Sequence, residues 1–140
     1  MSDHKIPVDA VKCPKSLKYG QPIMTTYIMG NLYSVYLHPR KILNKIVARC
    51  EAFTSFQEKE IRFSEENPSL AIILHELIHC YIAGTYIHEL NNLPNTDFEE
   101  VVCEVVSNNY VKILNKANMV KKAIEIELIK RKENELKKQC

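Results

Sequence analysis

The sequence lacks an apolar run long enough to cross a lipid bilayer, and its first residues, MSDHKIPVDAVK, lack the apolar segment of a secretory leader. These absences predict a cytoplasmic protein with no membrane association. The five cysteines include no C-x-x-C pair, and their odd number does not suit a disulfide framework. They indicate reduced, mostly buried thiols rather than a cysteine-based zinc knuckle. A formal net charge of +2 is too small to predict nucleic-acid binding.

The composition predicts one domain that spans residues 1–140. With 140 residues, of which 46% are hydrophobic and 26% charged, the chain is large enough for one core and too small for two domains. Residues 1–22 carry three prolines and a glycine, and we expect an irregular N-terminal segment. Residues 117–140 predict a C-terminal helix that docks through Val120, Ile124 and Leu128 and ends in a charged, solvated stretch. The alternative for that stretch is a basic segment that binds an acidic partner or nucleic acid.

Between these ends the sequence predicts an α+β fold. Residues 23–29 and 32–38 are rich in β-branched and aromatic residues, and Gly30-Asn31 between them suits a hairpin turn. Apolar residues over 42–53 recur at helical spacing and predict a helix that backs a small antiparallel or mixed sheet. Residues 60–64, EIRFS, alternate and predict a short strand. We expect that strand to be an edge to which an extended peptide could add.

The most informative stretch is residues 70–83, LAIILHELIHCYIA, which is apolar at nearly every position. Such a run predicts a helix buried on all sides. Asn67-Pro68 supplies a cap and a first-turn proline for its start, and Gly84 suits the residue just beyond its end.

The polar members of this helix spell H-E-x-x-H. His75 and His79 are four residues apart, so they lie one above the other on one helix face, with Glu76 about 100° away. Two imidazoles in that arrangement can hold one Zn²⁺, and the adjacent carboxylate can act as general base toward a metal-bound water. The other interpretation is a pair of core histidines that hydrogen-bond to backbone or carboxylate groups. We favour the metal, because burying three ionisable groups in an apolar helix is costly unless something satisfies them.

Two histidines leave a zinc site short of a third protein ligand. Residues 96–110, TDFEEVVCEVVSNNY, predict a helix that starts with a capping box formed by Thr96 and Glu99. Glu100 and Glu104 are an i,i+4 pair on one face of it, which suits a ligand and a second acid that orients a ligating histidine. Both lie nearly opposite the apolar stripe of the helix, so the alternative is a solvated face that carries two ordinary glutamates. His88 is a further alternative ligand.

H-E-L-I-H at 75–79, followed by F-E-E-V-V-C-E-V-V at 98–106, resembles the gluzincin metallopeptidases, whose third zinc ligand is a glutamate on a separate helix. The run at 93–105 is most similar to the peptidase module of plant LIM-domain ubiquitin-activated peptidases. A looser similarity extends to ImmA/IrrE-type peptidases and to mitochondrial Atp23-type peptidases. The resemblance covers Ile61 to Tyr110 and implies a small zincin-like domain. It implies the zinc ligands His75, His79 and Glu100, the general base Glu76, and the orienting acid Glu104.

These observations predict a zinc-dependent metalloendopeptidase with one Zn²⁺ ion, acting on a protein or peptide substrate. His88 and Tyr110 are predicted contacts for the oxyanion or the leaving group. We expect no membrane or nucleic-acid partner, and a regulatory partner that activates a latent form is left open. The alternative function is a metal-stabilised regulatory or binding protein of zincin fold with little or no turnover. The fold prediction comprises the sheet, its backing helix, the buried H-E-x-x-H helix and two C-terminal helices.

Overall fold

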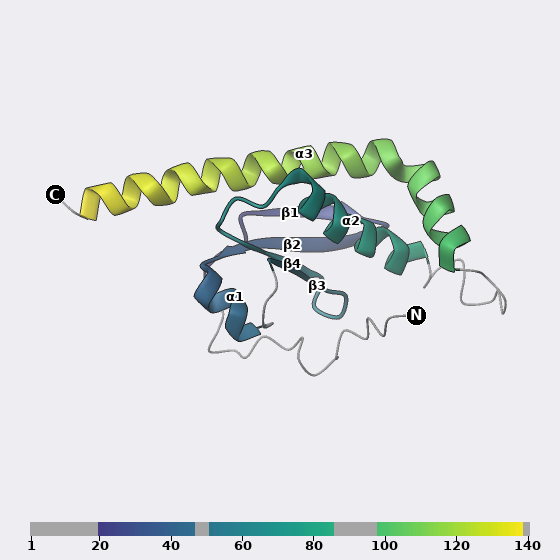
Figure 1. Cartoon of the computed structure of the whole chain (residues 1–140), viewed down its shortest axis with the longest axis horizontal. Helices are drawn as coiled ribbons and strands as arrows, with labels where there is room; N and C mark the ends of the chain where they lie inside the picture. Colours follow the sequence, from purple (N-terminus) through teal and green to yellow (C-terminus); the bar gives the residue numbers. More distant parts are fainter. Residues whose placement is uncertain (1–19, 47–50, 86–97, 139–140) are drawn as a thin grey trace.

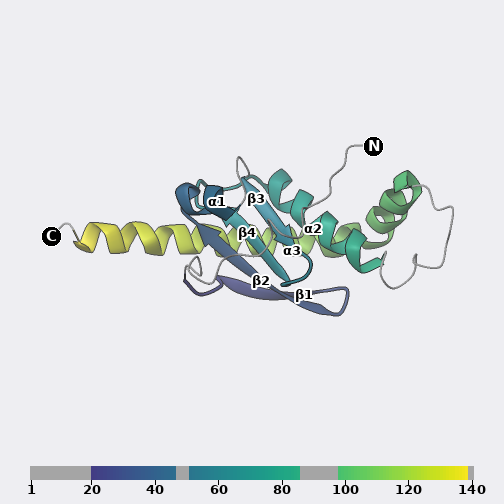
Figure 2. The ribbon, with the colours of Figure 1, turned by 90° about the horizontal axis from the view of Figure 1, so that it is seen from below.

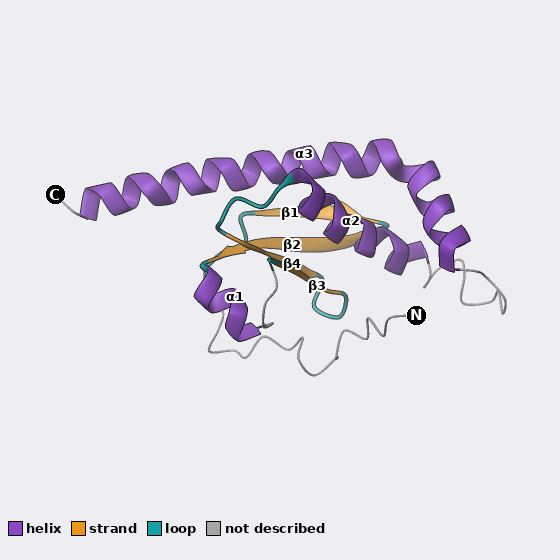
Figure 3. Cartoon of the chain, in the orientation of Figure 1, coloured by secondary structure: helices purple, strands orange, loops and turns teal. Residues whose placement is uncertain are grey.

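The computed structural model describes residues 20–46, 51–85 and 98–138. In these ranges a four-stranded mixed sheet packs with three helices, which confirms the predicted α+β class. Helices α2 (Leu70–Thr85) and α3 (Phe98–Lys138) lie on the same side of the sheet, while α1 (Arg40–Ile46) lies on the other (Figures 1 and 3). No helix in the described ranges is long and apolar enough to cross a membrane.

The first two strands form the predicted hairpin. Strands β1 (Met24–Ile28) and β2 (Asn31–His38) are antiparallel, and Ile28 pairs with Asn31 across the turn. The turn residues are therefore Met29 and Gly30, with φ of 51° and 81°. Two successive positive φ values give the primed turn that matches the twist of a hairpin. The predicted turn, Gly30-Asn31, is wrong by one residue.

The strand β4 (Glu60–Ser64) forms as predicted, but it is internal in the sheet. The strand order is β1-β2-β4-β3, with β4 parallel to β2 and antiparallel to β3 (Ala52–Ser55). Both sides of β4 are thus already hydrogen-bonded, so the prediction that a peptide adds to it is wrong. Among the described strands, β3 is the outermost on this side of the sheet (Figure 2).

The helix predicted over residues 42–53 is also wrong in extent. Helix α1 covers only Arg40–Ile46, and Ala52 and Phe53 belong to β3, where they pair with Phe63 and Arg62. Apolar spacing continued past the end of α1, but ladder hydrogen bonds to β4 determine the conformation of residues 52–55. The apolar spacing within residues 42–53 cannot reveal this pairing, because it depends on hydrogen bonds to another strand.

Helix α2 begins and ends differently from the prediction. The Ser69 hydroxyl accepts the backbone N–H of Ile72, so Ser69 caps the helix rather than Asn67. Gly84 lies inside the last turn instead of just beyond it. A Cβ at Gly84 would stand 2.6 Å from the Cβ of Met29, so the glycine allows the hairpin turn to approach the helix.

The prediction that α2 is buried on all sides is wrong. One face packs into the core through residues that include Ile73, Leu77 and Tyr81, while Ala71 and His75 on the opposite face are exposed. Among His75, Glu76 and His79, only Glu76 is buried. The sequence argument that burial of all three groups requires a metal therefore does not hold.

The two predicted C-terminal helices are one helix of 41 residues, α3, because no proline or glycine interrupts residues 98–138. Val120 and Ile124 are buried and Leu128 is partly buried, as predicted. Lys121 Nζ donates to Asn67 Oδ1 at 2.7 Å and to the Pro68 carbonyl at 2.8 Å, which holds α3 against the start of α2.

One core joins the sheet to α2 and α3. Alternate residues of β2 and β4 point toward the two helices and meet their apolar faces. The buried members from the strands and α3 include Val35, Leu37, Ile61, Phe63, Ile113, Ala117 and Val120. This core fixes α2 over the sheet, and thereby fixes the direction in which each polar residue of α2 points.

Candidate metal and catalytic site

The two histidines of α2 come together as the helical spacing predicts. The Nε2 atoms of His75 and His79 are 3.0 Å apart, and the rings meet edge to face with centroids separated by 4.7 Å. His75 is exposed and His79 is half-buried. Two ring nitrogens are therefore presented side by side at an accessible surface of the helix.

Glu76 points in another direction, toward strand β3. Glu76 is 8% exposed, and its Oε2 accepts a hydrogen bond of 2.5 Å from the Thr54 hydroxyl. Burial raises the pKa of Glu76, while the Thr54 hydrogen bond and the charge of His75 act in the opposite direction. The result is a buried carboxyl group with increased proton affinity on the turn of α2 that also carries His75 and His79.

Cys80 lies one turn beyond Glu76, on the same buried face of α2. Burial, with a further contribution from the charge of Glu76, raises the pKa of Cys80 to about 12. The thiol therefore stays protonated near neutral pH, and a protonated thiol is neither a nucleophile nor a good metal ligand. Cys80 is an uncharged packing residue in this arrangement.

The predicted third ligands lie on the first turns of α3. The side chains of Glu100 and Glu104 are both exposed, and Tyr110, a predicted oxyanion contact, is 60% exposed. Within residues 20–46, 51–85 and 98–138, no three His, Cys, Asp or Glu side chains converge into a group that could hold a metal ion. His88 and the capping residue Thr96 lie outside the described residues. Neither Glu100 nor Glu104 joins the histidine pair here, so the third ligand stays a prediction.

Thr54 is the site residue that the sequence analysis missed. The stretch AFTSF at 52–56 combines β-branched and aromatic residues, which is a strand signal. Its overlap with the apolar spacing of residues 42–53 concealed that signal. Once β3 is recognised, Thr54 takes the register position opposite Ile61 and is 3% exposed.

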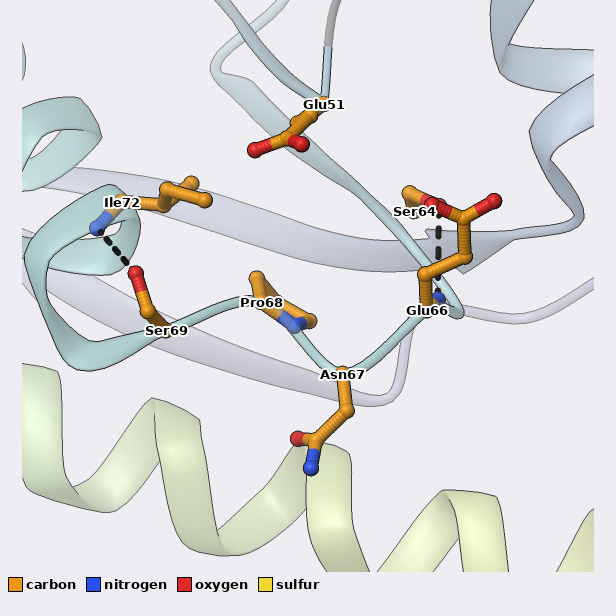
Figure 4. Close-up of a pocket in the computed structure, with 7 residues that line it drawn as sticks. All are labelled: Glu51, Ser64, Glu66, Asn67, Pro68, Ser69 and Ile72. Atoms are coloured by element: carbon orange, nitrogen blue, oxygen red, sulfur yellow. Dashed lines mark hydrogen bonds between the residues drawn. The ribbon is translucent and has the colours of Figure 1, made fainter.

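A second polar region surrounds the start of α2, where a cavity of about 110 Å³ opens (Figure 4). The Ser64 hydroxyl accepts the backbone N–H of Glu66, and Ser69 caps the helix. Arg40 lies within ion-pair distance of Glu51 and Glu66, at 3.9 and 3.6 Å. The polar groups of this cavity thus serve the turn before α2, and none of the H-E-x-x-H residues lines it.

Comparison of the chain with known protein families, with characterised proteins and with solved structures finds no match. A functional conclusion therefore depends on the geometry of α2 and β3.

Proposed function

We propose that this chain is a cytoplasmic, zinc-dependent metallopeptidase that hydrolyses peptide bonds of a protein substrate. The observation that carries the proposal is the 3.0 Å separation of the His75 and His79 Nε2 atoms on an accessible face of α2, with Glu76 the next residue in the helix after His75. Cys80 and Cys103 are free thiols, which suits a reducing compartment.

The donor atoms of this pair fit zinc. Zinc bonds imidazole nitrogens at about 2.0–2.1 Å with tetrahedral geometry, which separates two ligand nitrogens by roughly 3.3 Å. A small rotation of either imidazole ring would increase the observed Nε2–Nε2 distance of 3.0 Å to this value. Zinc bound there would activate a coordinated water and polarise the carbonyl of a scissile bond. Glu100 is the proposed third ligand and Glu104 its alternative, since both stand on the helix that packs against α2.

Glu76 is the proposed general base. Its buried position increases its proton affinity, so the carboxylate can accept a proton from water and deliver it to the leaving amine. The Thr54 hydroxyl binds Oε2 and leaves the other carboxylate oxygen for that transfer. Because α2 and β3 supply the two partners, the orientation of the base depends on the packing of helix against sheet.

The outer edge of β3, which no described strand pairs with, is the proposed position of the substrate peptide. Thr54 belongs to this strand and touches Glu76, so a peptide that adds to β3 as a further strand would run past the general base. This edge replaces β4, which the sequence analysis had proposed and which is internal.

The second candidate is a regulatory or binding protein that a metal stabilises and that turns over little or no substrate. The observation that favours it is the lack of a third converging ligand among the described residues. Two imidazoles alone bind zinc more weakly than the three protein ligands of catalytic sites.

Glu76→Gln separates the two functions, since the amide keeps the shape of the side chain and its acceptor for Thr54 but cannot take a proton. Zinc-loaded protein is incubated with a library of unstructured peptides, and products are read by mass spectrometry. Wild type cleaves the library, and Glu76→Gln retains its zinc and loses at least about 100-fold in kcat/KM.

The matched control is Glu135→Gln, which changes an exposed glutamate near the end of α3 and keeps the wild-type rate. Cleavage that persists in Glu76→Gln contradicts the proposed role of Glu76. A zinc-loaded wild type that cleaves nothing contradicts the peptidase and supports the binding protein.

A further inference from the structure

Helix α3 carries an apolar stripe that the fold does not use. Met119, Ile126, Ile129 and Leu136 are 58%, 46%, 59% and 59% exposed. Lys122 and Glu133, also exposed, lie on the same line along the helix. We call these six residues the outer stripe: Met119, Lys122, Ile126, Ile129, Glu133 and Leu136.

The spacing of the outer stripe is that of a coiled-coil seam. Its members follow one another at intervals of three, four, three, four and three residues, which is the a/d pattern of a heptad repeat. Two of the six positions are polar: Lys122 is second and Glu133 is fifth, so they are placed symmetrically about Ile126 and Ile129. A seam of this kind is typically covered by a second helix.

The outer stripe faces away from the rest of the molecule. Ile126 follows the buried Ile124 by two residues, which is about 200° around a helix. The sheet and α2 pack on the Ile124 side, and the C-terminal part of α3 extends past the other elements (Figures 1 and 2). A helix that docks on the outer stripe therefore does not meet the sheet or α2 of the same chain.

We propose that the outer stripe binds a second copy of this chain, with the two α3 helices antiparallel about a two-fold axis between Ile126 and Ile129. In this register Ile126 lies opposite Ile129 of the other copy, and Met119 lies opposite Leu136. Lys122 then lies opposite Glu133. All six positions find a complementary partner, and the two-fold axis produces each pair twice.

Charge selects the antiparallel arrangement. In a parallel pair, Lys122 would face Lys122 and Glu133 would face Glu133 at the seam, which is unfavourable. Lys122 and Glu133 cannot neutralise each other within one chain, because eleven residues of helix separate them by about 16 Å. The next flanking pair also agrees, since Glu125 lies near Lys132 of the other copy in the same register.

The mass of the full chain in solution tests this dimer. Sedimentation velocity over a concentration series gives a species of twice the 16.2 kDa chain mass at the higher concentrations. Ile126→Glu weakens the dimer by roughly 100-fold or more, since it places a charge in the seam. Leu114→Glu is the control, because Leu114 is 40% exposed on α3 but lies off the outer stripe. It leaves the dimer unchanged.

A charge exchange tests the register. Lys122→Glu and Glu133→Lys each weaken the dimer by roughly 10-fold, since each places like charges opposite one another twice. The double variant restores the wild-type dissociation constant, which a parallel pair or a merely structural effect would not do. A monomer at every concentration overturns the proposal and leaves the outer stripe to a different protein. A dimer that Ile126→Glu does not weaken, or one without rescue in the double variant, overturns it too. None of these results depends on zinc or on peptide cleavage.

Discussion

The residues of the candidate site divide into those positioned by helical spacing and those positioned by tertiary contacts. The pairing of His75 with His79 follows from four residues of helix, and the sequence predicted it. The exposure of that pair did not follow, because the burial of a helix face depends on what packs against it. Thr54 was missed for the same reason, since it reaches Glu76 only through the position of β3.

Also at the residue scale, the buried pair of His38 and Arg62 predicts that the stability of the protein depends on pH. His38 is fully buried on β2, and its Nε2 lies 2.6 Å from Arg62 Nη1. Burial lowers the pKa of His38 from 6.5 to about 4, helped by the charges of Arg62 and Arg131 and opposed by Glu60. The folded protein therefore binds a proton at His38 less readily than the unfolded chain does.

The sign follows from that difference. Between pH 6.5 and about 4 the unfolded chain takes up a proton that the folded state rejects, so acidification through this window favours unfolding. His38 contributes its full stability above pH 6.5, and about 2–3 kcal/mol is lost by pH 4. Urea unfolding at several pH values measures the loss. His38→Gln, which does not titrate, should lose less free energy of unfolding than wild type between pH 6.5 and about 4. If the free energy of unfolding falls equally with pH in the two proteins, His38 is not the source of the loss.

At the scale of elements, the local signals were right about what forms and less reliable about where it ends. The hairpin, β4 and the H-E-x-x-H helix were all predicted from their own residues. The observed boundaries differ from the predicted ones because contacts with other elements help to determine them. One example is the contact of Met29, in the hairpin turn, with the last turn of α2. The two helices predicted over residues 96–110 and 117–140 form the single helix α3, because none of the residues between them breaks a helix.

The contact between α2 and the hairpin turn predicts the effect of Gly84→Ala. The new Cβ would stand 2.6 Å from the Met29 Cβ and 2.8 Å from its Cγ, so turn or helix must shift. Overpacking of this kind costs about 1–3 kcal/mol in the free energy of unfolding.

Met29→Gly provides the control for this contact, since it removes the opposing Cβ and suits the φ of 51° at that position. In chemical unfolding experiments the double variant should be less destabilised than the sum of the two single variants. Strict additivity would mean that the two residues do not press on each other.

At the scale of the whole molecule, the residue patterns of the individual strands and helices were enough to predict the α+β class, but not the strand order. The sequence gives no local sign that β4 pairs with β2, because that parallel pairing joins residues far apart in the chain, such as Ser34 and Glu60. The position of Glu100 and Glu104 relative to α2 is likewise a matter of how α3 packs. The zinc ligand set is therefore the part of the account that depends most on tertiary structure.

One measurement tests the central claim, that His75 and His79 together hold a zinc ion. Crystals of the protein grown with zinc are measured at the zinc absorption edge, and the anomalous difference map locates the ion. A zinc ion held by the two histidines gives one peak bonded to both Nε2 atoms at about 2.0–2.1 Å, with the Glu100 carboxylate as the third protein ligand. No peak at the His75–His79 pair in zinc-saturated crystals, or zinc bound only elsewhere on the chain, would contradict it.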